Sequence, residues 1–191
     1  MNLEFEGKEG LLIRGGYTGD YGFKILVSSD KDKVIKNKIL SSEFDYKEIS
    51  IQTHNILISN FGNFTSFNLK NYIKNSFEFG FKHLIDFSKD DYIYYDKLNE
   101  LYPKYNKSTV AFICDELPNN MINTDVKYGD ITGNIIYYSY SYHLEKFIGY
   151  ILIDNKFALP GLTFNICENS KSLQTVSLPF YETKSFTTEI E

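Results

Sequence analysis

With 191 residues, the chain can form one large domain or two small ones, and 42% of it is apolar, which is enough for a packed core. Its formal net charge of −5 argues against a protein that binds duplex nucleic acid, because phosphate recognition needs a basic face. Cys114 and Cys167 lie in neither a CxxC nor a zinc-binding spacing, so the pattern predicts no disulfide framework and no metal site.

The sequence shows no sign of secretion or of a membrane anchor. Residues 1–6 are acidic and too poor in apolar residues for a signal peptide. No apolar run approaches the roughly 20 residues that a membrane span requires. We therefore expect a soluble protein of a reducing compartment, most simply the cytoplasm.

Two short strands are predicted near the N-terminus, over residues 11–14 and 23–27, with a glycine-rich turn over residues 15–22 between them. Apolar residues then recur at helical spacing and predict a helix over residues 31–40. Over residues 48–59 the isoleucines alternate as in a strand, while the family resemblance described below favours a helix for part of this span. Both alternatives stay open.

The middle of the chain has a less regular pattern. Residues 60–75 are polar and aromatic and predict an irregular segment, whereas residues 77–81 and 84–87 are strand-like. Asp90 or Asp91 is expected to cap a short helix that runs through Leu101, with Pro103 just beyond its end.

The last part of the chain is rich in β-forming residues, which are interrupted by Gly, Asp, Asn and Pro. Several short strands with turns between them predict a small barrel or a sandwich. We place the domain boundary near residues 103–107, which divides the chain into domains 1–105 and 106–191. The fold class is α+β. The β-rich runs cover residues 109–114, 131–142, 147–153, 162–166 and 173–180.

The stretch from Arg14 to Phe23 reads Arg-Gly-Gly-Tyr-Thr-Gly-Asp-Tyr-Gly-Phe. It resembles the motif Arg, any, Gly-Tyr-Thr-Gly-Glu, any, Gly-Phe of the glycine-cleavage T-proteins, which are folate-dependent aminomethyltransferases. The resemblance covers nearly the whole chain and corresponds to the C-terminal portion of the family. It implies a truncated aminomethyltransferase-like folate-binding fold followed by a small C-terminal β-barrel. Further similar segments follow in the same order at residues 75–81, 85–93, 148–151, 159–162 and 179–180.

The chain also departs from the family pattern. Asp20 stands where the family has glutamate, and the family's arginine-rich helix is most similar to residues 52–59, which retain neither its arginines nor its glutamate. The N-terminal domain of the family, which carries its catalytic aspartate, has no counterpart before Met1. Residues 89–96 lack the Cys and Gln-Glu of a related iron–sulfur-assembly branch.

The resemblance implies tetrahydrofolate as the cofactor, with Tyr17 and Asp20 as folate-binding residues. The alternative for Asp20 is a hairpin turn in which its carboxylate accepts hydrogen bonds from backbone amides. No catalytic residue is assigned within this chain. For Arg14, an ion pair is the expected role.

Other polar residues have structural interpretations. His54, His83 and His143 have neither an i, i+4 partner nor a nearby cysteine pair, so no metal site is expected. Cys114 and Cys167 lie in apolar strand runs and are expected to be buried, inert thiols. A buried carboxylate needs a partner, so Glu78 is given a structural role, and Asp90 and Asp91 that of helix caps. The tyrosines of residues 137–142 are expected to alternate between the barrel core and its outside.

From the resemblance we expect one subunit of a split tetrahydrofolate-dependent transferase of aminomethyl or methyl groups. A separate partner chain would supply the N-terminal domain and its catalytic aspartate, so that this chain is not catalytic alone. The alternative is a non-catalytic interaction or scaffold protein on a degenerate folate-transferase fold. Neither hypothesis includes a membrane or nucleic-acid partner.

Overall fold

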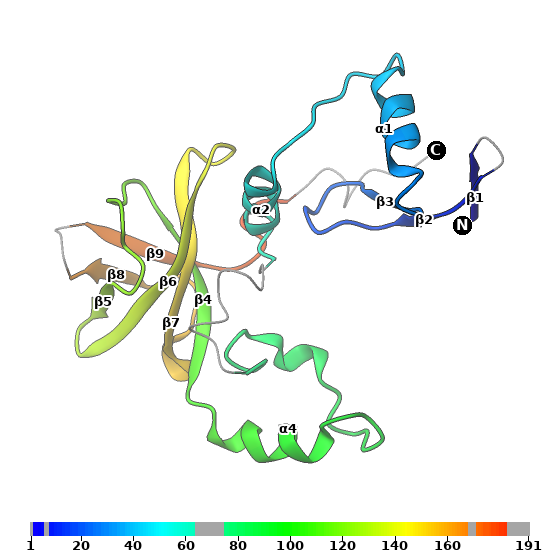
Figure 1. Ribbon diagram of the computed structural model, residues 1–191. Helices are drawn as coiled ribbons and strands as arrows, with labels where there is room; N and C mark the ends of the chain where they lie inside the picture. The colour runs from blue at the N-terminus through cyan, green and yellow to red at the C-terminus, as the bar shows by residue number, and fades with distance from the viewer. Residues whose placement is uncertain (1, 6–7, 64–74, 168–170, 183–191) are drawn as a thin grey trace. The chain divides into compact units, whose positions relative to one another are not determined.

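The computed structural model describes residues 2–5, 8–63, 75–167 and 171–182, and these form both helices and strands (Figure 1). The chain divides into two compact units, Met1–Asn63 with Tyr181–Glu191 and Phe64–Phe180. The boundary near residues 103–107 lies within the second unit, and the division into domains 1–105 and 106–191 stays a prediction.

An antiparallel three-stranded sheet opens the first unit. Its strands, in the order β1-β2-β3, are β1 (Asn2–Phe5), β2 (Lys8–Arg14) and β3 (Phe23–Leu26). β2 and β3 pair from Leu11 opposite Leu26 to Arg14 opposite Phe23, which confirms both strands predicted here. β1, with only four residues, carries too short an apolar pattern to be predicted from the sequence.

Helix α1 (Asp32–Leu40) confirms the helix predicted over residues 31–40. Asp32 lies in its first turn and Lys38 in its last turn, where each charge interacts favourably with the helix dipole. No side chain of α1 is buried. The helix therefore contributes no fully buried side chain to the first unit.

Helix α2 (Ile51–Asn60) decides between the two alternatives for residues 48–59. The Oγ of Ser50 accepts a hydrogen bond from the backbone N–H of Thr53 at 3.1 Å and so caps the helix. The helical alternative is correct, and the strand is wrong because this local cap outweighs the short isoleucine alternation. Ile58, Ser59 and Asn60, at the end of α2, are buried.

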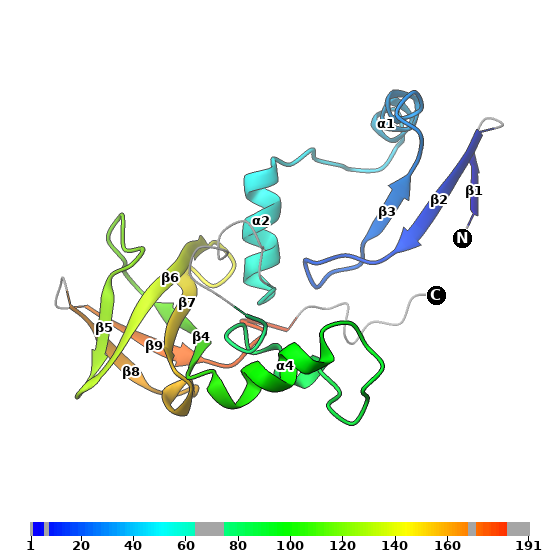
Figure 2. The ribbon, with the colours of Figure 1, turned by 60° about the horizontal axis from the view of Figure 1, so that its bottom comes forward.

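Six strands of the second unit form a closed antiparallel barrel in the order β4-β7-β6-β5-β8-β9 (Figures 1 and 2). Closure leaves no free sheet edge. The small barrel is therefore confirmed, and each predicted β-rich run contains one strand. A further strand, β5, lies between the first two runs. The strands are β4 (Lys107–Cys114), β5 (Asp125–Tyr128), β6 (Ile131–Ser141), β7 (Lys146–Asp154), β8 (Thr163–Ile166) and β9 (Ser172–Val176).

Alternate side chains of the strands fill the barrel interior. Phe112 of β4 packs there with Ile151 of β7 and Phe164 of β8, and all three are fully buried. Burial of each such side chain stabilises the fold by about 1.5–3 kcal/mol. A 3₁₀ turn, η3 (Asn155–Phe157), follows β7, and Phe157 packs against the same cluster.

A β-bulge between Ile135 and Tyr137 shifts the register of β6 against β7. Because the bulge interrupts the alternation, the consecutive residues Ile136 and Tyr137 both pack in the outer cluster with Tyr150, whereas Ile135 lies in the interior cluster. The neighbouring residue Gly149 allows this close approach, since a Cβ there would collide with the backbone oxygen of Tyr137.

The tyrosines of β6 alternate as predicted. Tyr138 packs against the interior cluster, whereas Tyr137 packs against the outer cluster around Tyr150. The hydroxyl of Tyr138 accepts a hydrogen bond from the backbone N–H of Asn120 at 2.9 Å. Tyr142, beyond the end of the strand, is exposed.

The strands predicted over residues 77–81 and 84–87 are wrong. The Oδ1 of Asn75 accepts hydrogen bonds from the backbone N–H groups of Phe77 and Glu78, at 3.0 and 3.1 Å, and so bends the chain. Gly80 then has a φ of 80°, and the 3₁₀ helix η1 (Phe81–Leu84) begins. These local hydrogen bonds outweigh the aromatic pattern that favours a strand.

The short helix before the barrel is α4 (Tyr95–Leu101), followed by the 3₁₀ turn η2 (Tyr102–Lys104), which contains Pro103. The helix is confirmed, but its cap is not Asp90 or Asp91. Tyr94, with a φ of 72°, occupies the cap position and makes no side-chain capping bond. The left-handed turn at Tyr94 starts the helix later than the aspartates suggest.

Candidate functional site

The glycine-rich loop of residues 15–22 is closed at its base. The backbone N–H of Gly15 donates a hydrogen bond to the oxygen of Gly22 at 2.8 Å, just beyond the strand pair of Arg14 and Phe23. The predicted turn-rich connection is thus confirmed. This closure holds the intervening residues as one defined loop.

The end of α2 and the residues after it hold the loop from one side. A Cβ on Gly19 would collide with the ring of Phe61, and Gly19 has a φ of 81°. The Nδ2 of Asn63 donates a hydrogen bond to the backbone oxygen of Tyr17 at 2.8 Å. Gly19 is therefore required both by its conformation and by the close approach of Phe61.

Asn60, immediately before Phe61, has a buried and incompletely bonded side chain. It is only 4% exposed, and its Nδ2 donates to the backbone oxygen of Ile56 at 2.7 Å. Its Oδ1 has no hydrogen-bond partner among the residues that the structure describes. Such an acceptor is costly to leave unsatisfied. The sequence carries no signal for Asn60 except a polar residue at the end of an apolar helical run.

Tyr17, one of the two predicted folate-binding residues, lies at the loop surface with 55% of its area exposed. The Nζ of Lys24 lies 3.9 Å from the centre of its ring. Hydrogen bonding with Lys24, together with the charge of that ammonium group, holds the pKa of Tyr17 below its ordinary value. Tyr17 is thus an exposed phenol next to a cation.

Asp20, the other predicted folate-binding residue, is exposed. In the described part of the chain, no backbone amide donates to its carboxylate, so the hydrogen bonds of the hairpin-turn alternative do not form there. Burial raises the pKa of Tyr181, and the negative charge of Asp20 raises it further. Asp20 is therefore a carboxylate exposed at the loop surface.

Arg14 and two aromatic residues lie at the base of the loop. The guanidinium carbon of Arg14 lies 5.5 Å from the centre of the Tyr21 ring, and Phe23 is the strand partner of Arg14. Tyr21 is 43% exposed and Phe23 60%. The expected ion pair of Arg14 does not occur among the residues that the structure describes.

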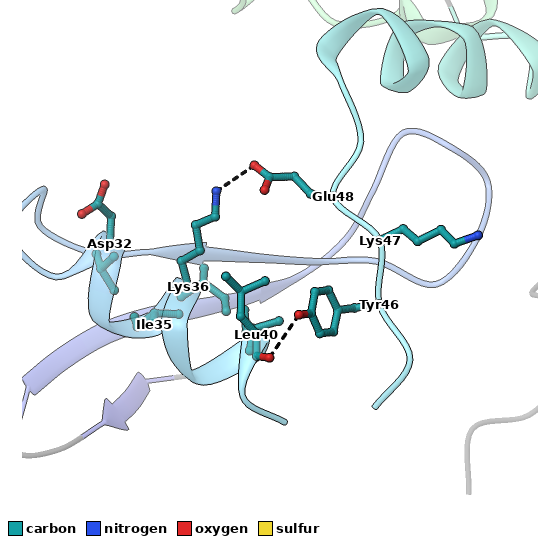
Figure 3. Close-up of a pocket in the computed structure, with 10 residues that line it drawn as sticks. Asp32, Ile35, Lys36, Leu40, Tyr46, Lys47 and Glu48 are labelled. Atoms are coloured by element: carbon teal, nitrogen blue, oxygen red, sulfur yellow. Dashed lines mark hydrogen bonds and ion pairs between the residues drawn. The ribbon is translucent and has the colours of Figure 1, made fainter. Parts of the chain in front are cut away.

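A separate cavity of about 500 Å³ lies between β3, α1 and residues 46–48 (Figure 3). Its lining is mainly aliphatic. At its rim the Nζ of Lys36 pairs with the Oε1 of Glu48 at 2.7 Å, and the hydroxyl of Tyr46 donates to the backbone oxygen of Leu40 at 3.1 Å. No residue of the glycine-rich loop lines this cavity, so the two features are distinct.

The remaining candidate residues, among them the three histidines, do not form a common site in the described part of the chain. His83 and His143 are exposed, while His54 is half-buried on α2. Across residues 2–5, 8–63, 75–167 and 171–182, no group of three His, Cys, Asp or Glu side chains is placed to hold a metal ion.

Glu78 is buried, and its backbone oxygen accepts a hydrogen bond from the backbone N–H of Thr109 at 2.8 Å. No helix in these ranges is long and apolar enough to cross a bilayer.

The two cysteines of the chain differ in their burial. Cys114 is buried at the end of β4, as predicted, and burial raises the pKa of its thiol. It also lines a cavity of about 260 Å³, beside an ion pair of 2.6 Å between Asp115 and Lys146. Cys167 is exposed, so its predicted burial is wrong. The strand ends at Ile166, whose side chain lies in the core, and the next residue has already left the sheet.

Comparison with known proteins places the fold. No protein-family model and no curated protein sequence matches the chain. Among solved structures, the chain is similar to the glycine cleavage system aminomethyltransferase T from Bartonella henselae, with a TM-score of 0.78 and 14% sequence identity. The match covers 95% of this chain and 52% of that protein, so this chain spans about half the length of the structure that it matches. At this identity the likeness shows a shared aminomethyltransferase fold.

Proposed function

We propose that this chain is one subunit of a tetrahydrofolate-dependent one-carbon transferase, of aminomethyl or methyl groups, in which Tyr17 and Asp20 contact the pterin. The catalytic aspartate is carried by a separate partner chain. The observation that carries the proposal is the glycine-rich loop, which presents both side chains at its surface on a fold shared with an aminomethyltransferase T.

The chemistry of the loop fits a reduced pterin. A pterin ring offers N–H donors at its 2-amino group and N3, and the exposed Asp20 carboxylate can accept them. The Tyr17 ring offers an aromatic face.

When bound, tetrahydrofolate would accept the one-carbon unit. The part played by this chain is to hold and orient the ring, which accelerates transfer through proximity. The partner's aspartate would position the donor amine and stabilise charge that develops during transfer.

The direct test is titration of the full chain with folinic acid, followed by isothermal titration calorimetry. We expect saturable binding that weakens about tenfold or more in Asp20→Ala, because hydrogen bonds to a charged group contribute about 1.5–3 kcal/mol. Asp130→Ala is the matched control, since Asp130 lies in the exposed turn between β5 and β6. If wild-type protein shows no saturable heat, the folate proposal fails.

The partner is tested separately. Affinity capture with the full chain from native extract, followed by mass spectrometry, should recover a chain similar to the N-terminal part of the T-proteins. Addition of that chain should then give one-carbon transfer that neither chain performs alone. Recovery of no such chain would contradict the split arrangement even if folinic acid binds.

A second candidate function is a non-catalytic interaction or scaffold protein. It is favoured by α2, where Thr53 and Leu57 stand at the positions of the arginines in the family motif, so the helix carries no guanidinium for a ligand. Thr53 instead contacts its own cap residue, Ser50. A stable complex with a partner in the absence of any folinic acid binding would support this candidate over the first.

A further inference from the structure

The cavity between β3, α1 and residues 46–48 lies within the first unit, and the glycine-rich loop contributes nothing to its lining (Figure 3). Its volume of about 500 Å³ lies within the range of roughly 300–1,000 Å³ that is typical of small-molecule sites. Such sites are lined mainly by apolar side chains, with a few polar groups that orient the ligand. The aliphatic side chains that line this cavity are those of Ile25, Val27, Ile35, Ile39 and Leu40.

One face of α1 gives the cavity an elongated wall. Residues 32, 35, 36, 39 and 40 all line it, and this spacing places their side chains along a single stripe of the helix. At a rise of about 1.5 Å per residue, the stripe is about 12 Å long. Ile39 and Leu40 are 48% and 39% exposed, and Ile25 on the β3 side is 38% exposed. The walls therefore offer apolar surface that a linear hydrocarbon of similar length would cover.

Polar contacts hold residues 46–48 against α1. The hydroxyl of Tyr46 donates to the backbone oxygen of Leu40 at the end of the helix, where carbonyl groups have no partner within the helix itself. The Nζ of Lys36 pairs with the Oε1 of Glu48, one turn earlier (Figure 3). The cavity is therefore formed before a ligand enters, which lowers the cost of ordering on binding.

Lys36 provides a cation at the rim of the cavity. An ammonium group has three N–H donors, so the bond to Glu48 leaves donors for a second acceptor. The side chains of Lys36 and Glu48 are 56% and 70% exposed, so water screens their ion pair and its exchange for another carboxylate costs little. Lys47 extends away from Lys36 (Figure 3), and the carboxylate of Asp32 accepts a hydrogen bond from the backbone N–H of Lys33. Lys36 is therefore the residue placed to receive an anionic group.

We propose that this cavity binds a free fatty acid of medium chain length, with its alkyl chain along the aliphatic stripe of α1 and its carboxylate on Lys36. A planar polar ligand would need flanking aromatic faces and several hydrogen-bond partners, whereas a fatty acid needs an apolar cavity and one cation. Because α1 contributes no fully buried side chain, the alkyl chain would serve as part of the core of the first unit and stabilise it. The site is independent of the proposed folate function.

The direct test is calorimetric titration of the full chain with hexanoate, octanoate and decanoate. We expect the affinity to rise about threefold to fourfold for each added methylene, because a buried CH₂ group contributes roughly that factor. The heat-capacity change of binding should be negative, as for any burial of apolar surface. 1-Decanol, which lacks the charge, should bind more weakly than decanoate. No saturable binding of decanoate, or an affinity that does not depend on chain length, would overturn the proposal.

Two variants test the apolar and the charged part of the site separately. Ile39→Trp fills the cavity and should weaken decanoate binding at least about tenfold. Lys36→Gln should abolish the preference for decanoate over 1-decanol. Lys33→Gln, which removes an equal charge from α1 outside the cavity lining, should retain that preference. Equal preferences in both lysine variants would overturn the role of Lys36. All three side chains are exposed, so the variants are expected to fold, and circular dichroism checks this.

Methyl NMR locates the ligand. In the full chain with ¹³C-labelled isoleucine and leucine methyl groups, decanoate should shift the signals of Ile25, Ile35 and Leu40 and leave that of Ile151 in the barrel unchanged. Shifts confined to the barrel would overturn the proposal. Binding of folinic acid without decanoate would overturn this inference alone, and binding of decanoate without folinic acid would overturn only the proposed function.

Discussion

The two units of this protein differ in how they bury apolar side chains. The barrel encloses an interior in which Phe112, Ile151 and Phe164 are inaccessible to solvent. Among the described side chains of the first unit, only Ile58, Ser59 and Asn60 are buried, and α1 has none. The candidate ligand loop belongs to the first unit. Its geometry thus depends on a few specific contacts rather than on a large core.

This contrast separates stability from function. The barrel has the close packing that makes core truncation expensive. The loop is held by Phe61, by Asn63 and by its own closing hydrogen bond. Substitutions in the barrel should therefore change the free energy of unfolding, whereas substitutions in the loop should change ligand affinity.

The largest expected effect is that of core truncation in the barrel. Phe112→Ala should lower the free energy of unfolding by about 3–5 kcal/mol, because it removes a fully buried ring and leaves a cavity. Ile35→Ala, which truncates a half-buried side chain of α1, should cost about 1 kcal/mol. Urea unfolding followed by circular dichroism measures both. Similar losses for the two variants would contradict the contrast between the units.

A glycine substitution tests the loop. Gly19→Ala should abolish folinic acid binding while the barrel transition stays unchanged, because the new Cβ collides with Phe61 in a left-handed backbone. Gly129→Ala is the matched control, since Gly129 has a φ of 59° and no heavy atom lies within 4 Å of the position that a new Cβ would take. That control should cost about 1 kcal/mol of barrel stability and leave binding intact. Loss of binding in both variants would show that the effect is not local.

Alkaline pH tests the buried tyrosine of the barrel. Burial raises the pKa of Tyr150 well above its ordinary value. Its unfolded pKa is about 10, so its contribution to stability is complete below about pH 10 and is lost as the pH rises above it. Between pH 10 and 11, wild type should lose about 1 kcal/mol more than Tyr150→Phe. The exposed Tyr142→Phe should follow wild type, and a parallel decline of all three proteins would contradict the assignment.

The smallest effect concerns Tyr17, where a neighbouring charge rather than burial shifts the pKa. Hydrogen bonding with Lys24 and its charge lower the pKa of Tyr17, so Lys24→Gln should raise the pH at which Tyr17 ionises. Titration of ¹³C-labelled tyrosine by NMR measures this, with Lys33→Gln as a control that leaves the midpoint unchanged. An unchanged midpoint in Lys24→Gln would show that the two side chains do not interact in solution.

Several elements were predictable because their signals are local. The strands around the loop, helix α1 and the barrel strands follow from apolar periodicity and turn residues that lie close together in the chain. The strand predicted over residues 77–81 fails for an equally local reason, since the Oδ1 of Asn75 bonds two backbone amides and bends the chain. The helix at residues 51–60 depends on the Ser50 cap, a signal that the isoleucine alternation obscures.

For the candidate site, the sequence by itself determined the glycine-rich loop, because a turn motif is a property of neighbouring residues. The choice of Tyr17 and Asp20 within it came from the resemblance to the glycine-cleavage T-proteins. Tertiary structure alone decided that Phe61 covers Gly19 and that Asn60 is buried. It also decided that Arg14 lies over the ring of Tyr21, with no ion pair among the described residues. The contact of Phe61 with Gly19 joins segments that are distant in the chain. The burial of Asn60 and the pairing of Arg14 depend on the surrounding fold, and a single sequence does not encode such contacts in any local pattern.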